Sequence, residues 1–170
     1  MPNKFILTSI FASLVLSAAI FGFFYAWVCS TMWGLDAADP RVAIKAMQAM
    51  NASVRNGVFF PAFFLTPVAL ALTAILAMRG GFARASGLFG LSAVIYLLFG
   101  LFLTMAINVP MNEALATVEV LQTVEDAQQI WNDYSPRWQF WNITRTIASG
   151  LSFVVALAGV LSLNSQRKGA

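Results

Sequence analysis

Residues 59–78 read FFPAFFLTPVALALTAILAM and contain no charged side chain. Their length matches the roughly 20 apolar residues that a helix needs to cross a hydrocarbon core of about 30 Å. No water in that core can satisfy backbone polar groups, so each such segment is expected to be a helix. Three further segments share this character, and Arg145 is the only charged residue among all four. The predicted membrane spans cover about residues 5–28, 58–78, 85–109 and 138–163.

The composition supports the same class of protein. Of the 170 residues, 59% are apolar and 10% are charged, against about 45–50% and about 25% in an average soluble domain. A net charge of +3 in so apolar a chain argues against a nucleic-acid partner. Histidine is absent and Cys29 is the only cysteine. These counts exclude a zinc site, an internal disulfide and a Ser-His-Asp or Cys-His hydrolase, so no metal is expected.

We expect residues 1–170 to form a single domain, an all-α integral membrane four-helix bundle with a helical cap built from its two outer loops. In the first of these loops, Asp39 and Pro40 are typical of a helix N-cap and first helical position. The amphipathic sequence that follows predicts a helix ending near Asn51. Gly80 and Gly81 predict the tight turn between the second and third spans.

The second outer loop also carries helix signals. Pro110 is expected to break the third span, and Asn112 is expected to cap a new helix from Glu113 to about Trp131. Residues 135–136, Ser-Pro, repeat the cap signal and predict the start of the fourth membrane helix.

The distribution of charge predicts the orientation in the membrane. One side carries Lys4, Arg79, Arg84, Arg167 and Lys168, whereas all seven acidic residues lie in the two longer loops on the other side. Cytoplasmic loops carry the excess of Lys and Arg. We therefore expect both termini in the cytoplasm, the long loops in the periplasm or outside the cell, and a bacterial inner membrane as the location. The first segment is longer than the apolar region of a signal peptide, so we expect a retained helix.

The fourth span contains the most informative spacing. Trp138, Trp141, Asn142 and Arg145 follow an i, i+3, i+4, i+7 pattern, which places them on one face of a helix. Arginine near the hydrocarbon is costly unless it extends to the head groups or faces a polar interior. Both interpretations of Arg145 are open, and the neighbouring Asn142 favours the interior cluster.

Two further polar groups lie at a similar depth on the outer side. Asn108, Asn112 and Glu113 surround Pro110 at the end of the third span, where an ordinary helix exit with Asn112 as an N-cap is favoured over a small polar site. Asn51 and Arg55 precede the second span, where an arginine extending to the head groups explains the pattern as well as a ligand contact does. All five tryptophans also fall near this outer face: Trp27, Trp33, Trp131, Trp138 and Trp141.

Together these motifs are similar to a known family. Residues 108–112 read Asn-x-Pro-x-Asn, and they are followed by Trp131, Tyr134, Trp138 and an Asn-x-x-Arg motif at residues 142–145. This combination resembles the anthrone oxygenase family of small four-span membrane proteins. The resemblance implies oxidation of an anthrone-type phenolic polycycle to a quinone by dioxygen, without metal or flavin and hence with no cofactor.

The resemblance also implies roles for the polar residues. Donors to an enolate oxygen would come from Arg145, Asn108, Asn112 and Asn142. Glu113 would be the base, a role that requires its partial burial. A flat aromatic substrate arriving from the lipid bilayer would contact Trp138, Trp141, Trp131, Tyr134, Asn51 and Arg55.

The alternative function is a membrane protein without catalytic activity. Such a protein would bind a lipid or a quinone-like molecule, or would serve as a subunit of a membrane complex, as a homo-oligomer or with a partner subunit. The absence of histidine favours this alternative, because histidine is the usual general base.

Overall fold

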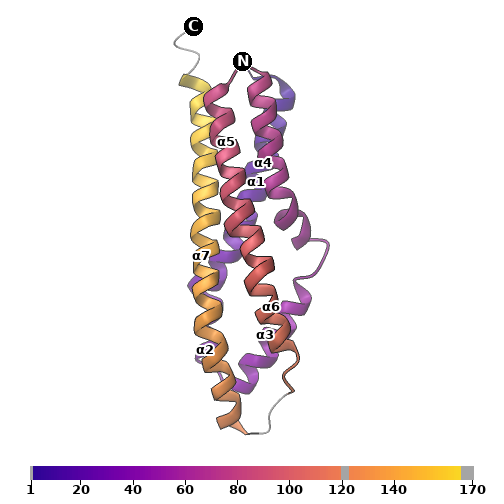
Figure 1. Ribbon diagram of the computed structural model, residues 1–170, viewed down its shortest axis with the longest axis vertical. Coiled ribbons are helices and arrows are strands. Elements are labelled where there is room, and N and C mark those ends of the chain that lie inside the picture. Colours follow the sequence, from indigo (N-terminus) through magenta and orange to yellow (C-terminus); the bar gives the residue numbers. More distant parts are fainter. Residues whose placement is uncertain (1, 120–122, 166–170) are drawn as a thin grey trace.

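The computed structural model describes residues 2–119 and 123–165, and over these residues it contains helices and no strand (Figure 1). Four helical stretches are long and apolar enough to cross a membrane, and each coincides with one predicted span. The prediction of an integral membrane four-helix bundle is therefore confirmed. The four stretches are Lys4–Asp36, Phe59–Arg79, Ala83–Ala116 and Val124–Leu163.

Two of the four stretches change their helical geometry along their length, whereas the other two are continuous α-helices. The first comprises α1 (Lys4–Ala26), the π-helical segment η1 (Trp27–Thr31) and α2 (Met32–Asp36). The third comprises α5 (Ala83–Ile95), the π-helical segments η2 (Tyr96–Phe102) and η3 (Thr104–Asn108), and α6 (Val109–Ala116). The second and fourth are α4 (Phe59–Arg79) and α7 (Val124–Ser165). Such π-turns are rare and are frequently found at functional sites.

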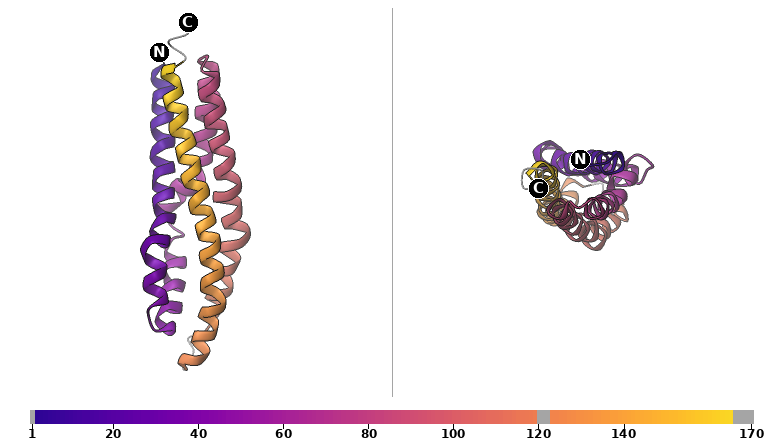
Figure 2. Two further views of the ribbon diagram at one scale, coloured as in Figure 1. Left: turned by 90° about the vertical axis from the view of Figure 1, so that its left-hand side faces the viewer. Right: turned by 90° about the horizontal axis from the view of Figure 1, so that it is seen from above.

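The four long helices form a closed ring in the order α1, α4, α5, α7, because each packs against two neighbours in that order. Both ends of the described chain lie at one end of the bundle (Figure 2). The turn between α4 and α5 is tight as predicted, with Gly81 at a φ of +80°, a conformation that favours glycine.

Hydrogen bonds between small polar side chains join the helices inside the bundle. Ser13 of α1 lies 2.7 Å from Thr73 of α4, and the hydroxyl groups of Ser92 in α5 and Ser152 in α7 are 2.9 Å apart. Lipid tails are as apolar as the protein core, so helix association in a membrane depends on close packing and on bonds of this kind. These contacts hold the helices in one register and thereby position the residues farther along the bundle.

The helix predicted in the first outer loop is confirmed. It is α3 (Pro40–Ser53), and the Asp39 side chain caps it by accepting a hydrogen bond from the backbone N–H of Arg41 at 2.9 Å. The Arg41 guanidinium also binds this carboxylate and lowers the pKa of Asp39 to about 2. The cap is therefore charged at neutral pH.

The predicted organisation of the second outer loop is wrong. The third stretch continues through Pro110, which lies in the first turn of α6, and ends at Ala116. Pro110 occupies one of the first positions of α6, directly after the π-helical segment η3, where its missing N–H is tolerated. Asn112 is inside α6 and is no cap, and α7 begins at Val124 and passes without a break through Pro136.

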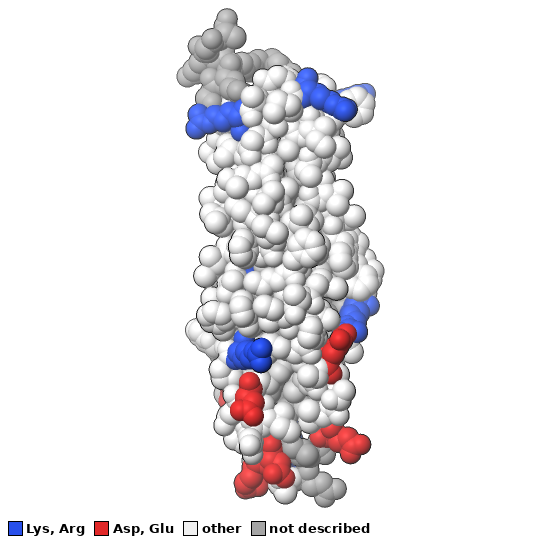
Figure 3. Space-filling model, viewed as in Figure 1, with Lys and Arg blue, Asp and Glu red and all other residues white. Residues whose placement is uncertain are grey.

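Charged residues are distributed unevenly along the bundle (Figure 3). Lys and Arg occupy the end that carries the termini, and Asp and Glu occupy the opposite end together with further basic residues. The positive-inside rule infers the orientation of a membrane protein from such an excess of Lys and Arg on one side. The assignment of the termini to the cytoplasm, and of the membrane to a bacterial inner membrane, stays a prediction.

Candidate functional site

A cavity of about 260 Å³ lies in the half of the bundle that carries the cap. Six phenylalanines and two tryptophans contribute to its walls, so most of its surface is apolar. Its polar lining comes from α3, η3, α6 and α7 and from the segment before α4. The polar residues that line it are Asn51, Arg55, Thr104, Asn112, Glu113 and Arg145.

Arg145 is inside the bundle, with only 5% of its surface exposed. Its Nε donates a hydrogen bond to Oδ1 of Asn142 at 3.0 Å, and Nη1 donates to the hydroxyl of Thr104 at 3.5 Å. The guanidinium carbon lies 4.5 Å from the ring centre of Phe24 and 5.0 Å from that of Trp138. The interpretation of an arginine extending to the head groups is therefore wrong, and the interior polar cluster is confirmed.

No carboxylate in the described part of the chain forms an ion pair with Arg145. Its positive charge is held instead by a neutral amide, a hydroxyl and two aromatic faces, which are cation–π partners. A buried arginine without a counter-ion is costly in a low-dielectric interior. An anionic ligand in the adjoining cavity would supply that missing charge.

Asn142 orients the guanidinium. It is 1% exposed, and its Nδ2 donates to the backbone carbonyl of Phe24 in α1 at 3.3 Å. The Nε of arginine can only donate, so the atom of Asn142 that faces Arg145 is the oxygen. Asn142 thus joins α1 to α7, and Nη2 of Arg145 is left without a hydrogen-bond partner among the described residues.

Asn112 is not the predicted helix cap but binds two aromatic side chains of α7. Its Oδ1 accepts two hydrogen bonds, from the hydroxyl of Tyr134 at 2.9 Å and from Nε1 of Trp138 at 2.8 Å. An indole N–H only donates, which identifies the acceptor atom as the oxygen. The amide nitrogen has no partner among the residues that the structure describes, and Asn112 lines the cavity. The bonds from Tyr134 and Trp138 fix the orientation of the amide, so that Nδ2 of Asn112 is available as a donor.

The remaining predicted polar residues fall into two groups. Nδ2 of Asn51 and both side-chain polar atoms of Asn108 are buried without a hydrogen-bond partner in the described chain. Asn51 lines the cavity, but Asn108 does not. At the mouth, Arg55 and Glu113 form an ion pair of 3.3 Å, with side chains 54% and 59% exposed. The partial burial expected for Glu113 is not found.

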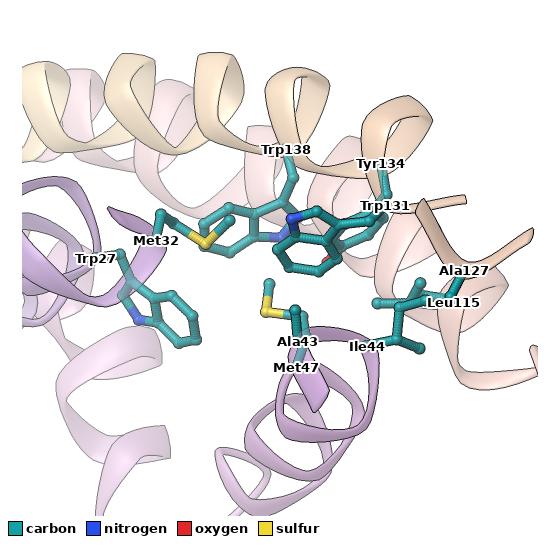
Figure 4. Packing of buried hydrophobic residues seen from close by; sticks show 10 residues of the cluster. All are labelled: Trp27, Met32, Ala43, Ile44, Met47, Leu115, Ala127, Trp131, Tyr134 and Trp138. Carbon is teal, nitrogen blue, oxygen red and sulfur yellow. The ribbon is translucent and has the colours of Figure 1, made fainter. Parts of the chain in front are cut away.

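The predicted aromatic residues do not form one surface. Trp138 lines the cavity, with its ring centre 5.0 Å from that of Trp27. Figure 4 shows Trp131, Tyr134 and Trp138 of α7 together in the buried cluster that packs against α3. Neither Trp131 nor Tyr134 reaches the cavity wall, and Trp141 is half-buried against Phe140 and also lies outside it.

Two contributing residues are not evident from the sequence: Thr104, which lines the cavity, and Asp36, which lies outside it in the cap. Thr104 precedes Asn108 by four residues, and this helical spacing is the signal that would have found it. Asp36 accepts hydrogen bonds from Trp131, Ser135 and Gln139 at 2.9, 2.6 and 2.8 Å and so joins the end of α2 to α7. Its partners are about a hundred residues away in the sequence, so no local pattern reveals it.

Comparison with known proteins gives one match. The family model described as anthrone oxygenase matches residues 50–155, which is more than half of the chain. This segment contains the polar residues of the cavity from Asn51 to Arg145. No curated protein and no solved structure matches the chain. The protein, with its four apolar helices and its buried arginine beside an aromatic cavity, belongs to the anthrone oxygenase family.

Proposed function

We propose that the protein oxidises a hydrophobic phenolic polycycle of the anthrone type to a quinone, with dioxygen as the oxidant. The observation that carries the proposal is the polar lining of the buried end of the cavity. Arg145, Nδ2 of Asn112 and Nδ2 of Asn51 all offer donors, and the one carboxylate, Glu113, is at the mouth. Such a lining favours a ligand with an oxygen acceptor, and an oxyanion most of all.

The apolar part of the cavity supports a flat aromatic ligand. Phe24 and Trp138 flank the guanidinium, and Phe59 and Phe63, which also line the cavity, stack with ring centres 5.2 Å apart. Aromatic rings pack well in offset or edge-to-face arrangements against such side chains. The low dielectric of this environment strengthens the attraction between Arg145 and an anionic oxygen.

The proposed reaction begins with loss of a proton from the methylene carbon opposite the substrate carbonyl. The resulting enolate oxygen is stabilised by Arg145 and Asn112, as preorganised donors stabilise an oxyanion. The carbanionic carbon then gives its electrons to dioxygen and forms a C–O bond. The peroxide anion takes up a proton, and loss of the second proton from the same carbon then cleaves the O–O bond. The outer oxygen leaves as hydroxide, which takes up a proton to give water, and the carbon is left as a new carbonyl. One substrate and one dioxygen thus give one quinone and one water, with four electrons transferred.

The proposal is tested with the purified protein in lipid nanodiscs, incubated with anthrone in air. We expect quinone absorbance to rise faster than in empty nanodiscs, and an oxygen electrode should record one dioxygen consumed per quinone formed. A rate equal to the spontaneous rate would contradict the proposal.

Although Glu113 lacks the partial burial expected of a base, it is the proposed base because it is the one carboxylate among the residues that line the cavity. Replacing Glu113 by glutamine is expected to lower kcat about 100-fold, the low end of the range for general base catalysis. The effect is limited because Glu113 is exposed and solvent bases reach the same position. Replacing Glu119, an exposed acid outside the cavity, by glutamine is the matched control and should leave kcat unchanged. An unchanged kcat in Glu113→Gln would show that a group other than Glu113 accepts the proton.

A second candidate is a protein that binds a quinone-like ligand or a lipid without catalysing a reaction. The observation in its favour is that Glu113 is exposed and paired with Arg55, so the described cavity has no buried base. Tight binding of a hydroxylated quinone without any anthrone oxidation would support this candidate. Assembly with a second copy or with a partner subunit also stays a prediction.

A further inference from the structure

A second hollow adjoins the cavity. It is a groove of about 530 Å³ between α1, the end of α3 and the start of α4. The groove shares five lining residues with the cavity: Phe23, Trp27, Met50, Val54 and Phe59. One layer of side chains therefore separates the two spaces.

Few polar groups of the groove are free to bind a ligand. The hydroxyls of Thr31 and Ser53 donate to carbonyls of their own helices, at 3.3 and 3.0 Å. Asn56 accepts from the backbone N–H groups of residues 58 and 59, at 2.8 and 2.9 Å, and its Nδ2 donates to the carbonyl of Ser53. Among the other lining side chains only Trp27 has a polar atom, its indole Nε1, and the rest are apolar. An occupant must therefore be apolar over most of its length in the groove.

The groove is long and includes small residues on two helices. Its wall on α1 and η1 extends from Ala19 to Thr31 across the end of the predicted first span, a distance of about 18 Å at 1.5 Å per helical residue. Ala19 and Ala26 of α1 and Ala62 of α4 leave room between the two helices. These dimensions suit an extended hydrocarbon chain.

The sizes of the cavity and the groove also indicate that one ligand occupies both. At about 260 Å³ the cavity is below the range of about 300–1,000 Å³ that is usual for small-molecule sites. The partition between cavity and groove includes Phe23 and Phe59, whose ring centres are 4.8 Å apart. Both rings are half-buried and neither has a polar atom. A change of rotamer would therefore join the two spaces without breaking a hydrogen bond.

We propose that the groove binds an unbranched aliphatic chain of the same ligand whose oxygenated ring lies in the cavity. The natural ligand is then a phenol or quinone with a hydrocarbon tail, which enters from the bilayer. This inference rests on the proposed ring-binding role of the cavity and adds the chain to the substrate class.

The test uses two probes and the protein in nanodiscs of one lipid composition. The probes are a hydroxynaphthoquinone that is anionic at neutral pH and its derivative with a long unbranched alkyl chain. Ala62→Phe and Ala19→Phe each fill the groove from one wall, and neither residue lines the cavity. Ala71→Phe is the matched control, because Ala71 is exposed on α4 outside both spaces.

We expect either groove variant to weaken binding of the tailed probe about tenfold or more, because the added ring occupies the volume of the chain. The affinity for the tailless probe should stay the same, and Ala71→Phe should change neither affinity. Each variant is compared with the wild type for each probe, so partitioning of the probes into the bilayer cancels.

Other outcomes overturn the inference. Equal affinities for the tailed probe in the wild type and in both groove variants would place the chain outside the groove. An equal loss for both probes would show that the substitutions act through the ring site. If the groove variants lose only a co-purified phospholipid, seen by native mass spectrometry, the occupant is a bilayer lipid. If the wild type binds neither probe, the proposed oxyanion cavity fails, and the chain site fails with it.

Discussion

Replacing Arg145 by leucine is expected to lower kcat of anthrone oxidation by about 100- to 1,000-fold, the usual cost of removing one oxyanion donor from an active site. The guanidinium is buried beside the cavity and has no carboxylate partner in the described chain, so its charge is available to the developing enolate. Because this interaction strengthens as the anion forms, kcat should fall more than KM changes. Initial rates of quinone formation over a range of anthrone concentrations measure both constants.

Arg137→Leu is the matched control for this variant. Arg137 is an exposed arginine on the same helix and lies outside the cavity, so its loss should change kcat by less than twofold. Arg145→Lys should fall between Arg145→Leu and the wild type, because lysine keeps the charge but loses the planar fork that binds Asn142 and Thr104. A folded Arg145→Leu variant with wild-type kcat would contradict the proposed role of the guanidinium.

Replacing Asn112 by leucine is expected to lower the free energy of unfolding by about 2–6 kcal/mol, which corresponds to about 1–3 kcal/mol for each of two buried donors left without an acceptor. The donors are the hydroxyl of Tyr134 and Nε1 of Trp138, whose residues are 8% and 1% exposed. Leucine has the same branched shape and number of side-chain heavy atoms as asparagine but cannot accept a hydrogen bond. Unfolding of the purified protein in a denaturing detergent, followed by circular dichroism, measures the change.

A second substitution separates the lost hydrogen bonds from altered packing. Replacing Tyr134 by phenylalanine in the Asn112→Leu background removes one orphaned donor, so the double variant should recover about 1–3 kcal/mol. Asn132→Leu, at an exposed asparagine of α7, is the control and should change stability by less than about 0.5 kcal/mol. A double variant no more stable than Asn112→Leu would mean that Asn112 does not act through these two bonds.

The membrane spans and the first cap helix follow from local sequence. Hydrophobic length determines the spans, and Asp39 with Pro40 gives the start of α3, because both signals act within a few turns of one helix. In the second outer loop, Pro110 and Pro136 predict helix boundaries that the structure does not have. Whether a helix ends at a proline depends on the turn before it and on the packing around it, which a local pattern does not contain.

The candidate site was predictable in part. The spacing of Trp138, Asn142 and Arg145 places all three on the buried face of α7, because helical periodicity alone assigns residues to a face. The spacing does not specify which residues of the other helices pack against that face. Asn112 was identified as polar and near the site, but its bonds to Tyr134 and Trp138 join two helices across a loop.

The sequence alone determined that this chain is an all-helical membrane protein with four spans, a charge asymmetry and an arginine on one face of the last span. These properties depend on hydrophobicity and periodicity, which are local. Only the tertiary structure decided that Arg145 points inward beside a cavity, and that Glu113 stays exposed at its mouth. The environment of a side chain is set by residues from other helices, brought together by the packing of α1, α4, η3, α6 and α7 around one space.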